Sequence, residues 1–345
     1  MNIALQGLFP DELQSVCKDI GQPAFRARQL WQWIQVQGAT HWDQMGNLPK
    51  ALKERLAQTH TPAPVRILQE AGSPGQTRKW LLELQDGERV ETVVIPARDR
   101  HTVCLSTQVG CRMGCSFCAS AKGGFARNLS AGEIVAQVQM AAAALGGRPD
   151  NVVYMGMGEP FDNYDNVLKS VRILNHAEGL NLGARRITLS TCGIIPGIQR
   201  LAGEGLQVEL SVSLHAPRSD LRRHFMPVEA RYPLDELVAA CAEYTAKTKR
   251  HITFEYTLVK GLNDSVRDAE ELAKQLQGFP CRINAIPLSP VEEFAGEAPP
   301  RQAMRTFLKI LARHGIEGTL RESKGSRVRA ACGQLRRGFA PQRHP

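Results

Sequence analysis

The segment Thr102–Ser120, TVCLSTQVGCRMGCSFCAS, joins a β-branched strand to a loop that contains three cysteines. Cys111, Cys115 and Cys118 have C-x3-C-x2-C spacing. Three thiolates can bind three irons of a [4Fe–4S] cube and leave the fourth iron open to a small molecule. A structural zinc site is the alternative, but it usually needs four ligands and paired C-x2-C knuckles. The spacing therefore predicts an iron–sulfur cluster with an open iron.

The stretches around and after this segment alternate between short β-branched strands and amphipathic helices. Strands are predicted at residues 103–109, 151–157, 187–191, 207–215, 252–259 and 282–288. Such alternation favours a parallel sheet with helices outside it. Six units suit an open barrel better than a flat sheet, so we predict an α/β fold with a partial (βα)6 barrel. Ser130 and Glu133 form an S-x-x-E capping box at the first helix, which leaves residues 111–129 as a predicted loop.

The chain before residue 99 predicts two smaller units. Helical stretches in residues 1–60 predict a small bundle, and two alternating segments between Lys79 and Ile95 flank Asp86-Gly87, a strong hairpin signal. We therefore divide the chain into an N-terminal helical accessory domain (1–60), a β-hairpin extension (61–98), a partial barrel (99–326) and a basic C-terminal tail that carries Cys332 (327–345).

The second predicted helix combines apolar and basic residues. Phe25, Leu30, Trp31 and Ile34 recur at helical spacing within PAFRARQLWQWI. The arginines of this segment could contact RNA. A packed apolar stripe with arginine stems lying along it is the favoured interpretation.

Composition limits the class of protein. The 345 residues are 43% apolar and 22% charged, as in folded soluble proteins. No apolar run approaches the roughly 18 residues of a membrane helix, and the start MNIALQGLFPDEL lacks a basic signal region, so we expect a cytoplasmic protein without a membrane partner. Three of the nine cysteines fall within eight positions, which favours metal or redox chemistry over a disulfide framework. The net charge of +9 fits either a phosphate-bearing partner or a solvated surface.

The cysteine loop resembles that of the radical S-adenosylmethionine (SAM) superfamily, with the aromatic Phe117 beside the last cysteine. Further motifs narrow the resemblance to the RlmN/Cfr family of adenosine methyltransferases, which act on ribosomal RNA and tRNA. In order along the chain these are PAFRARQLW (23–31), VETVVIP (90–96), KGGFARNL (122–129), MGMGEP (155–160), RRITLST (185–191), SLHAP (213–217) and AACGQL (330–335). The resemblance covers almost the whole chain.

The resemblance implies two cofactors, a [4Fe–4S] cluster and SAM. It implies SAM contacts at Gly158, Glu159, Ser190, Ser213, Leu214, His215 and Ser289. Without it, a G-x-G-E-P segment would be an ordinary turn, and a serine or histidine at a strand end an ordinary structural polar group. Two positions depart from the family: Ser289 stands where Asn is common, and Val328-Arg329 where Ile-Asp is usual. A serine can still donate and accept hydrogen bonds, so we expect SAM binding to survive.

Three further residues acquire roles only through the resemblance. Cys332 resembles the cysteine that accepts a methyl group and carries it to RNA as S-methylcysteine. Cys104 resembles the partner that later forms a transient disulfide with Cys332, and Glu91 the proton acceptor. Without the resemblance, both cysteines would be small buried apolar residues, and Glu91 a solvated strand residue.

The implied function is methylation of an adenosine ring carbon, C2, in 23S rRNA, with tRNA as a second substrate. An electron donor such as flavodoxin or ferredoxin and a monomeric state are also expected. Three alternatives stay open. They are methylation at C8 of the same adenosine, as in Cfr, a radical SAM reaction on another substrate, and an RNA-binding protein with a structural cluster.

Overall fold

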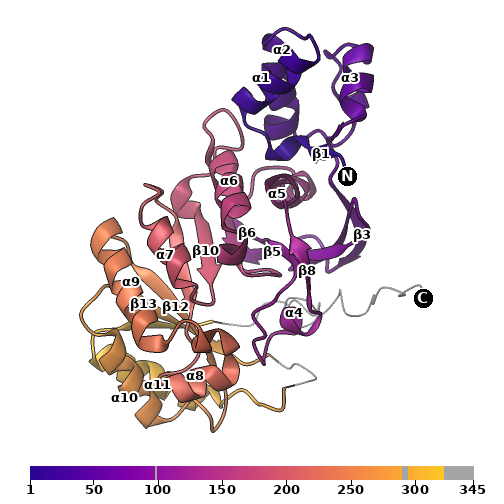
Figure 1. Cartoon of the computed structure of the whole chain (residues 1–345). Coiled ribbons are helices and arrows are strands. Elements are labelled where there is room, and N and C mark those ends of the chain that lie inside the picture. Colours follow the sequence, from indigo (N-terminus) through magenta and orange to yellow (C-terminus); the bar gives the residue numbers. More distant parts are fainter. Residues whose placement is uncertain (98, 290–293, 322–345) are drawn as a thin grey trace.

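The computed structural model describes residues 1–97, 99–289 and 294–321, and its main feature is one ten-stranded sheet (Figure 1). Seven parallel strands form the barrel part of this sheet. They are β6 (Arg100–Cys104), β9 (Asn151–Tyr154), β10 (Ile187–Thr191), β11 (Glu209–Ser213), β12 (Ile252–Leu258), β13 (Cys281–Pro287) and β14 (Glu317–Leu320). Each pairs with the next in chain order, so the sheet curves without a crossover in its strand order.

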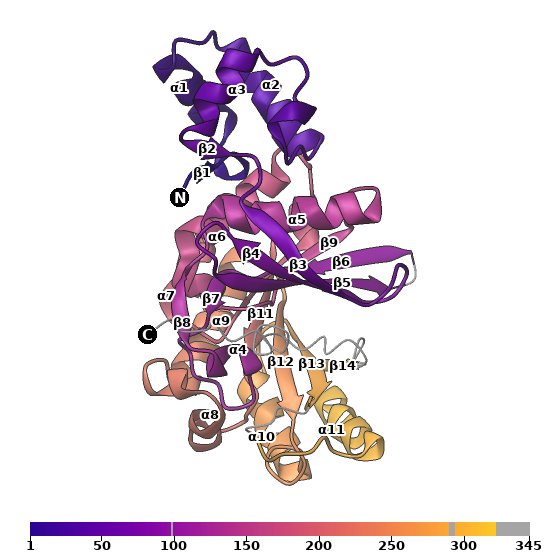
Figure 2. The same cartoon turned by 90° about the vertical axis from the view of Figure 1, so that its right-hand side faces the viewer.

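Helices follow the barrel strands and cover the outer face of the sheet (Figures 1 and 2). They are α5 (Ala131–Leu145), α6 (Tyr164–Asn175), α7 (Ile195–Leu201), α9 (Leu234–Thr248), α10 (Val266–Leu276) and α11 (Arg301–Arg313). The short helix α8 (Ser219–Phe225) lies between β11 and α9 in the chain. The six strand–helix units confirm the predicted partial barrel. The strand β14 was not predicted, because its sequence EGTL is short and lacks an apolar alternation.

The two faces of the barrel sheet differ in chemistry. Leu210 and Val212 of β11 point outward and are buried in the core beneath the helices. Ser211 and Ser213 of the same strand point to the inner face, because successive side chains alternate. Ser213 is paired in register with Glu255 of β12, so the inner face carries a row of polar groups. This polar inner face is where site residues can gather.

The predicted hairpin is confirmed and is larger than expected. Strands β3 (Val65–Ala71), β4 (Arg78–Leu84) and β5 (Arg89–Ala97) form an antiparallel meander, and β5 pairs with β6. Gly87 makes the predicted turn with a φ of +81°, and its N–H donates to the carbonyl of Leu84. The additional strand β3 is mostly exposed and lacks the alternation that predicts a strand. The hairpin is therefore continuous with the barrel sheet.

The N-terminal residues form the expected small helical unit. It contains α1 (Pro10–Asp19), α2 (Phe25–Trp31) followed by a π-helical turn (Gln32–Val36), α3 (Lys50–Ala57), and the short parallel pair β1 (Ile3–Ala4) and β2 (His60–Thr61). Short 3₁₀ turns lie at Leu5–Gly7, Trp42–Gln44, Pro160–Asn163, Ala184–Arg186 and Pro227–Ala230. No helix in the described ranges is both long and apolar enough to cross a bilayer.

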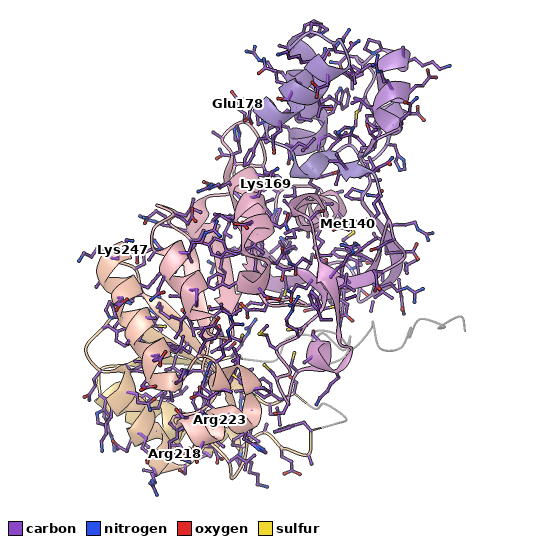
Figure 3. The ribbon with its side chains drawn as sticks, viewed as in Figure 1. Met140, Lys169, Glu178, Arg218, Arg223 and Lys247 are labelled. Atoms are coloured by element: carbon purple, nitrogen blue, oxygen red, sulfur yellow. The ribbon has the colours of Figure 1, made fainter. Side chains whose placement is uncertain are left out.

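The apolar stripe of α2 is buried, with one exception. Leu30 and Trp31 are buried, whereas Phe25 is 51% exposed, so its place in the stripe is corrected. Trp31 Nε1 donates to the carbonyl oxygen of Glu178 at 2.7 Å. Glu178 lies in the segment of the barrel that faces the N-terminal helices (Figure 3). Through Trp31, α2 thus contacts the barrel.

The segment between β6 and α5 is more structured than predicted. It contains β7 (Gln108–Gly110), α4 (Ala119–Lys122) and β8 (Phe125–Asn128), so the prediction of a continuous loop is wrong. The β7–β8 pairing brings together residues far apart in the segment, which local patterns do not reveal. The capping box is confirmed, because Glu133 N–H donates to Ser130 Oγ and Ser130 N–H to Glu133 Oε2.

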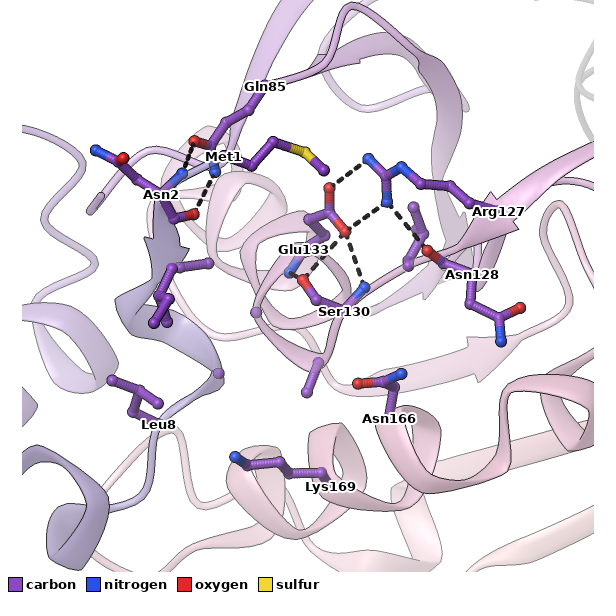
Figure 4. A pocket seen from close by; sticks show the side chains of 16 residues that line it. Met1, Asn2, Leu8, Gln85, Arg127, Asn128, Ser130, Glu133, Asn166 and Lys169 are labelled. Carbon is purple, nitrogen blue, oxygen red and sulfur yellow. Dashed lines mark hydrogen bonds and ion pairs between the residues drawn. The ribbon is translucent and has the colours of Figure 1, made fainter. Parts of the chain in front are cut away.

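A cavity of about 500 Å³ lies between the chain start and the first turn of α5 (Figure 4). Arg127 and Glu133 both line this cavity, and they form an ion pair at 2.8 Å. Arg127 also pairs with Asp86 of the hairpin turn at 2.6 Å. Through these two ion pairs, Arg127 connects the hairpin turn to the first turn of α5.

Candidate active site

The three predicted cluster cysteines lie together on the segment between β7 and α4. Cys111 N–H donates to the carbonyl of Gly124, and Ser116 N–H donates to the carbonyl of Phe225 in α8. Gly114, between Cys111 and Cys115, has a φ of +72°, which a residue with a side chain would rarely adopt. The loop is therefore shaped by its glycine and held against α8.

The electrostatics of these thiols fit a metal cluster. Burial raises the pKa of Cys111 to about 12 and the pKa of Cys115 further, and the charge of Cys118 adds to both shifts. The raised pKa values of Cys111 and Cys115 mean that a bound cation would be needed to stabilise their thiolate forms. In the described parts of the chain, no three His, Cys, Asp or Glu side chains are already arranged as a closed metal site. The three-thiol donor set nevertheless matches the ligand type of an iron–sulfur cluster.

A buried arginine beside the cluster loop was missed by the sequence analysis. Arg222 in α8 has no exposed side-chain surface, forms an ion pair with Glu229, and donates through Nη2 to the carbonyl of Cys192 at 2.7 Å. Its charge lowers the pKa of Cys115 against the larger effect of burial. Because α8 has the charged sequence SDLRRHF, the sequence gives no sign that one arginine is buried.

The segment Gly156-Met157-Gly158-Glu159 follows β9, and its glycines are required by close contacts. A Cβ on Gly156 would lie 2.3 Å from the carbonyl oxygen of Leu105. Gly158 has a φ of +102°, and a Cβ there would lie 2.6 Å from Gln108 Cβ. The backbone of this segment therefore packs directly against the strand end that leads to the cluster loop.

Glu159, an expected SAM contact, is buried and already accepts two backbone hydrogen bonds. Its Oε1 accepts from Phe161 N–H at 3.0 Å and its Oε2 from Cys192 N–H at 2.7 Å. Burial raises the pKa of this carboxyl above its usual range. The side chain thus links the end of β9 to the end of β10, and its remaining lone pairs can accept from an ammonium group.

The other expected SAM contacts lie on neighbouring strand ends. Ser190 of β10 is paired in register with Ser211 of β11, and Ser213 ends β11, with both expected serines partly exposed. Leu214 has no exposed surface and belongs to the hydrophobic core, so only its backbone is available for a ligand. Ser289 is half-buried and follows β13.

His215 connects the end of β11 to the cluster loop. Its Nδ1 accepts from Thr257 N–H at 2.9 Å, and its ring contacts Phe117 edge to face with centroids 4.8 Å apart. Burial lowers the pKa of His215 to about 3. The imidazole is therefore neutral, and because Nδ1 accepts, its proton is on Nε2.

Glu91 and Cys104 lie on the same face of the sheet in adjacent strands. Cys104 of β6 is paired in register with Val93 of β5, two residues from Glu91. Glu91 is buried, and its Oε2 lies 2.6 Å from Nζ of Lys79, a residue that the sequence analysis did not single out. Cys104 is buried and forms no disulfide with any of the described residues. Cys332 lies outside the described residues, so the expected disulfide with Cys104 stays a prediction.

A second carboxylate on the inner face was also missed. Glu255 of β12 is 5% exposed, and Asn284 Nδ2 of β13 donates to its Oε2 at 3.0 Å. Burial raises the pKa of Glu255. In the segment ITFEYTLV this glutamate occupies a polar position of an alternating strand, but the sequence does not show which face the barrel encloses.

Three cysteines on a glycine-shaped loop, at the carboxyl ends of a partial barrel, define a radical SAM enzyme. Residues 105–276 match the model of the Radical SAM superfamily. A solved radical SAM methyltransferase from Sphaerobacter thermophilus is 47% identical, with a TM-score of 0.93, and the match covers 96% of this chain and 98% of that one. Members of the superfamily use a [4Fe–4S] cluster and SAM, which confirms the two predicted cofactors.

More specific matches cover the N-terminal unit and the full length. Residues 3–61 match the Ribosomal RNA large subunit methyltransferase N-terminal domain. A probable dual-specificity RNA methyltransferase RlmN of Moorella thermoacetica is 46% identical, covering 97% of both chains. One of Symbiobacterium thermophilum is also 46% identical, covering 96% of this chain and 91% of its own. The chain belongs to the RlmN family of radical SAM methyltransferases.

Proposed function

We propose that this protein methylates C2 of an adenosine in 23S rRNA and in tRNA, with Cys332 as the methyl carrier. The observation that carries this proposal is the placement of Glu91 and Cys104 on one face of the sheet, in adjacent strands that lead into the cluster loop. A base and a resolving thiol are both needed for such a reaction. The printed names of the relatives, which are RNA methyltransferases, support the substrate class.

The chemistry requires more than polar methyl transfer. The ring carbons of adenine are poor nucleophiles, so the methyl group of SAM cannot be transferred to them directly as a methyl cation equivalent. The cluster and SAM supply a radical when they are bound. In the proposed sequence, Cys332 carries the methyl-derived carbon to the base, and Glu91 takes the ring proton. The Cys104 thiolate then attacks the Cys332 sulfur, so that an S–S bond forms as the bond from that sulfur to the methylene carbon breaks. The carbon keeps the electron pair of the broken bond and takes up a proton, which gives the methyl group of the product. The carboxylate and both thiols must then approach the same adenine.

Each expected cofactor contact has a definite task in this proposal. Cys111, Cys115 and Cys118 would hold three irons. Glu159, with lone pairs left after its two backbone hydrogen bonds, would accept from the SAM ammonium. The serines at the ends of β10 and β11 would orient polar groups of the same molecule. His215 would act as a neutral Nε2 donor or as a packing surface beside Phe117.

The proposal includes partners that supply electrons and substrate. A one-electron donor such as flavodoxin or ferredoxin would reduce the cluster, and an external reductant would reopen the Cys104–Cys332 disulfide. We propose that the enzyme acts as a monomer in the cytoplasm, where its RNA substrates and reduced thiols are found.

Anaerobic turnover of the reduced holoenzyme with rRNA fragments and with tRNA, followed by nucleoside mass spectrometry, tests this function. We expect 2-methyladenosine from both RNAs. Finding only 8-methyladenosine would assign the C8 reaction and overturn the C2 proposal. Cleavage of SAM without any methylated adenosine would indicate another substrate, and a lack of SAM cleavage would indicate a non-enzymatic role.

A further inference from the structure

Lys79 has no exposed side-chain surface, although lysine is almost never fully buried unless its charge is paired. Its Nζ lies 2.6 Å from Oε2 of Glu91, whose side chain is 1% exposed. At this distance the contact is a charge-assisted hydrogen bond. Two opposite charges have therefore been taken out of water in neighbouring strands of the sheet.

The strand register places this pair beside the other expected catalytic group. Lys79 of β4 is opposite Val93 of β5, and Glu91 is opposite Leu81, so the charged side chains are diagonal neighbours on one face. Val93 is in turn opposite Cys104 of β6. Lysine, carboxylate and thiol thus come from three consecutive strands and share one face.

Stability alone does not account for the pair. Replacing a buried ion pair by apolar residues of similar shape is often neutral or stabilising. The opposite face of β4 shows that this strand packs large apolar residues well, because Trp80 and Leu82 are fully buried there. The lysine on the face that carries Glu91 and Cys104 is therefore better explained by a role in the reaction than by a contribution to stability.

We infer that Lys79 is the positioning residue for the base, holding the Glu91 carboxylate in one orientation and compensating its charge in a buried site. This inference rests on the proposed function, in which Glu91 accepts the ring proton. In that step the proton passes from C2 of adenine to a Glu91 oxygen, the electron pair of the C–H bond stays with the ring, and Lys79 keeps its protons. The backbone of Glu91 is fixed separately, since Ser106 Oγ donates to its carbonyl oxygen at 2.6 Å.

Lys79→Met, which keeps a linear side chain but removes the charge, tests the inference in the reduced holoenzyme. We expect cluster absorbance and Cys332 methylation at the wild-type stoichiometry, and product formation slowed on the order of 100-fold, the scale of a lost general base. RNA should accumulate as an adduct on Cys332, and we expect the same of Glu91→Gln, because removal of the ring proton is slowed in both variants. Trp80→Phe, a buried change on the other face of β4, is the matched control and should show no adduct.

A double variant separates positioning from a structural role. If Lys79 acts through Glu91, Lys79→Met/Glu91→Gln should form product no more slowly than Glu91→Gln alone, because the two effects are not independent. The double variant also removes the negative charge of Glu91 that Lys79→Met leaves without its lysine, so it stays informative if Lys79→Met folds poorly. Rate losses that simply multiply would overturn the inference, as would a cluster-loaded Lys79→Met enzyme that turns over at the wild-type rate.

The same series distinguishes this inference from the function on which it rests. Normal product from Glu91→Gln would mean that Glu91 is not the base, and the proposed function would fail at that step. An adduct in Glu91→Gln together with normal turnover in Lys79→Met would leave the proposed function intact and overturn only the role of Lys79.

Discussion

Cys104 is held in a regular barrel strand, in contrast to the loop that carries the cluster cysteines. Its position in the ladder, opposite Val93 and Val153, leaves it little freedom to move. A disulfide requires Cβ atoms about 3.5–4.5 Å apart, so Cys332 has to come to Cys104 at that step. The resolving thiol is thus the fixed member of the proposed pair.

Cys104→Ala should trap the RNA on the enzyme, because nothing can then displace Cys332. We expect a covalent RNA–protein species on denaturing gels of the variant isolated with RNA, whereas Cys332→Ala should give neither adduct nor product. Cys241→Ala, which alters a fully buried cysteine of α9, is the control and should cost only modest stability. Turnover of Cys104→Ala without any adduct would refute the assigned roles.

The buried imidazole of His215 should make the free energy of unfolding depend on pH. The folded protein holds its pKa near 3, whereas an unfolded histidine has a pKa of about 6.5. Below pH 6.5 the unfolded chain takes up a proton that the folded chain cannot, so stability is lost as the pH falls towards 3. The limiting loss is about 1.4 kcal/mol per pH unit.

Urea unfolding of wild type and His215→Gln at pH 7.5 and 5.5 measures this effect. We expect the difference in unfolding free energy between the two pH values to be smaller in the variant. Identical pH dependence of the two proteins would contradict the assignment of a buried, neutral imidazole.

At the scale of elements, the turn after β9 leaves no room for a side chain at Gly156 or Gly158. Gly158→Ala would place a Cβ against Gln108 and force an unfavourable φ, so we expect the turn to shift and SAM affinity to fall at least tenfold, the effect of about 1.4 kcal/mol. Equilibrium binding of SAM to the cluster-loaded variant measures this. Gly147→Ala is the control, since a Cβ there meets nothing within 4 Å, and it should bind SAM normally.

Patterns among residues close in sequence predicted most elements. Contacts between residues far apart in sequence could not be predicted from such patterns. The cysteine spacing, the Asp86-Gly87 turn and the Ser130 cap depend on residues close in sequence, and the structure contains each of them. Lys79 occupies a polar position of an alternating strand, which in an isolated hairpin would face water. Only the fusion of the hairpin to the barrel places that face inside the molecule, so the buried ion pair could not be predicted.

At the scale of the whole molecule, the net positive charge should affect the affinity for RNA. The net charge of +9 should make RNA affinity strongly dependent on salt, through release of counterions from phosphates. We expect the affinity to fall at least tenfold between about 50 and 200 mM salt, whereas SAM cleavage without RNA should change little. Fluorescence anisotropy with labelled RNA measures the first quantity. Affinity that does not vary with salt would argue against a phosphate-dominated interface.

The open sheet has a consequence for the shape of the substrate. Within the described residues the strand order runs from β14 to β3, so these two strands are edges and the ring stays incomplete. An incomplete ring can be approached from the side as well as from the strand ends. A nucleotide in the middle of a long polymer could enter while the strand on either side leaves through the gap. Under the proposed function, the enzyme would then need no free terminus to thread, and internal positions of a folded RNA would be within its reach.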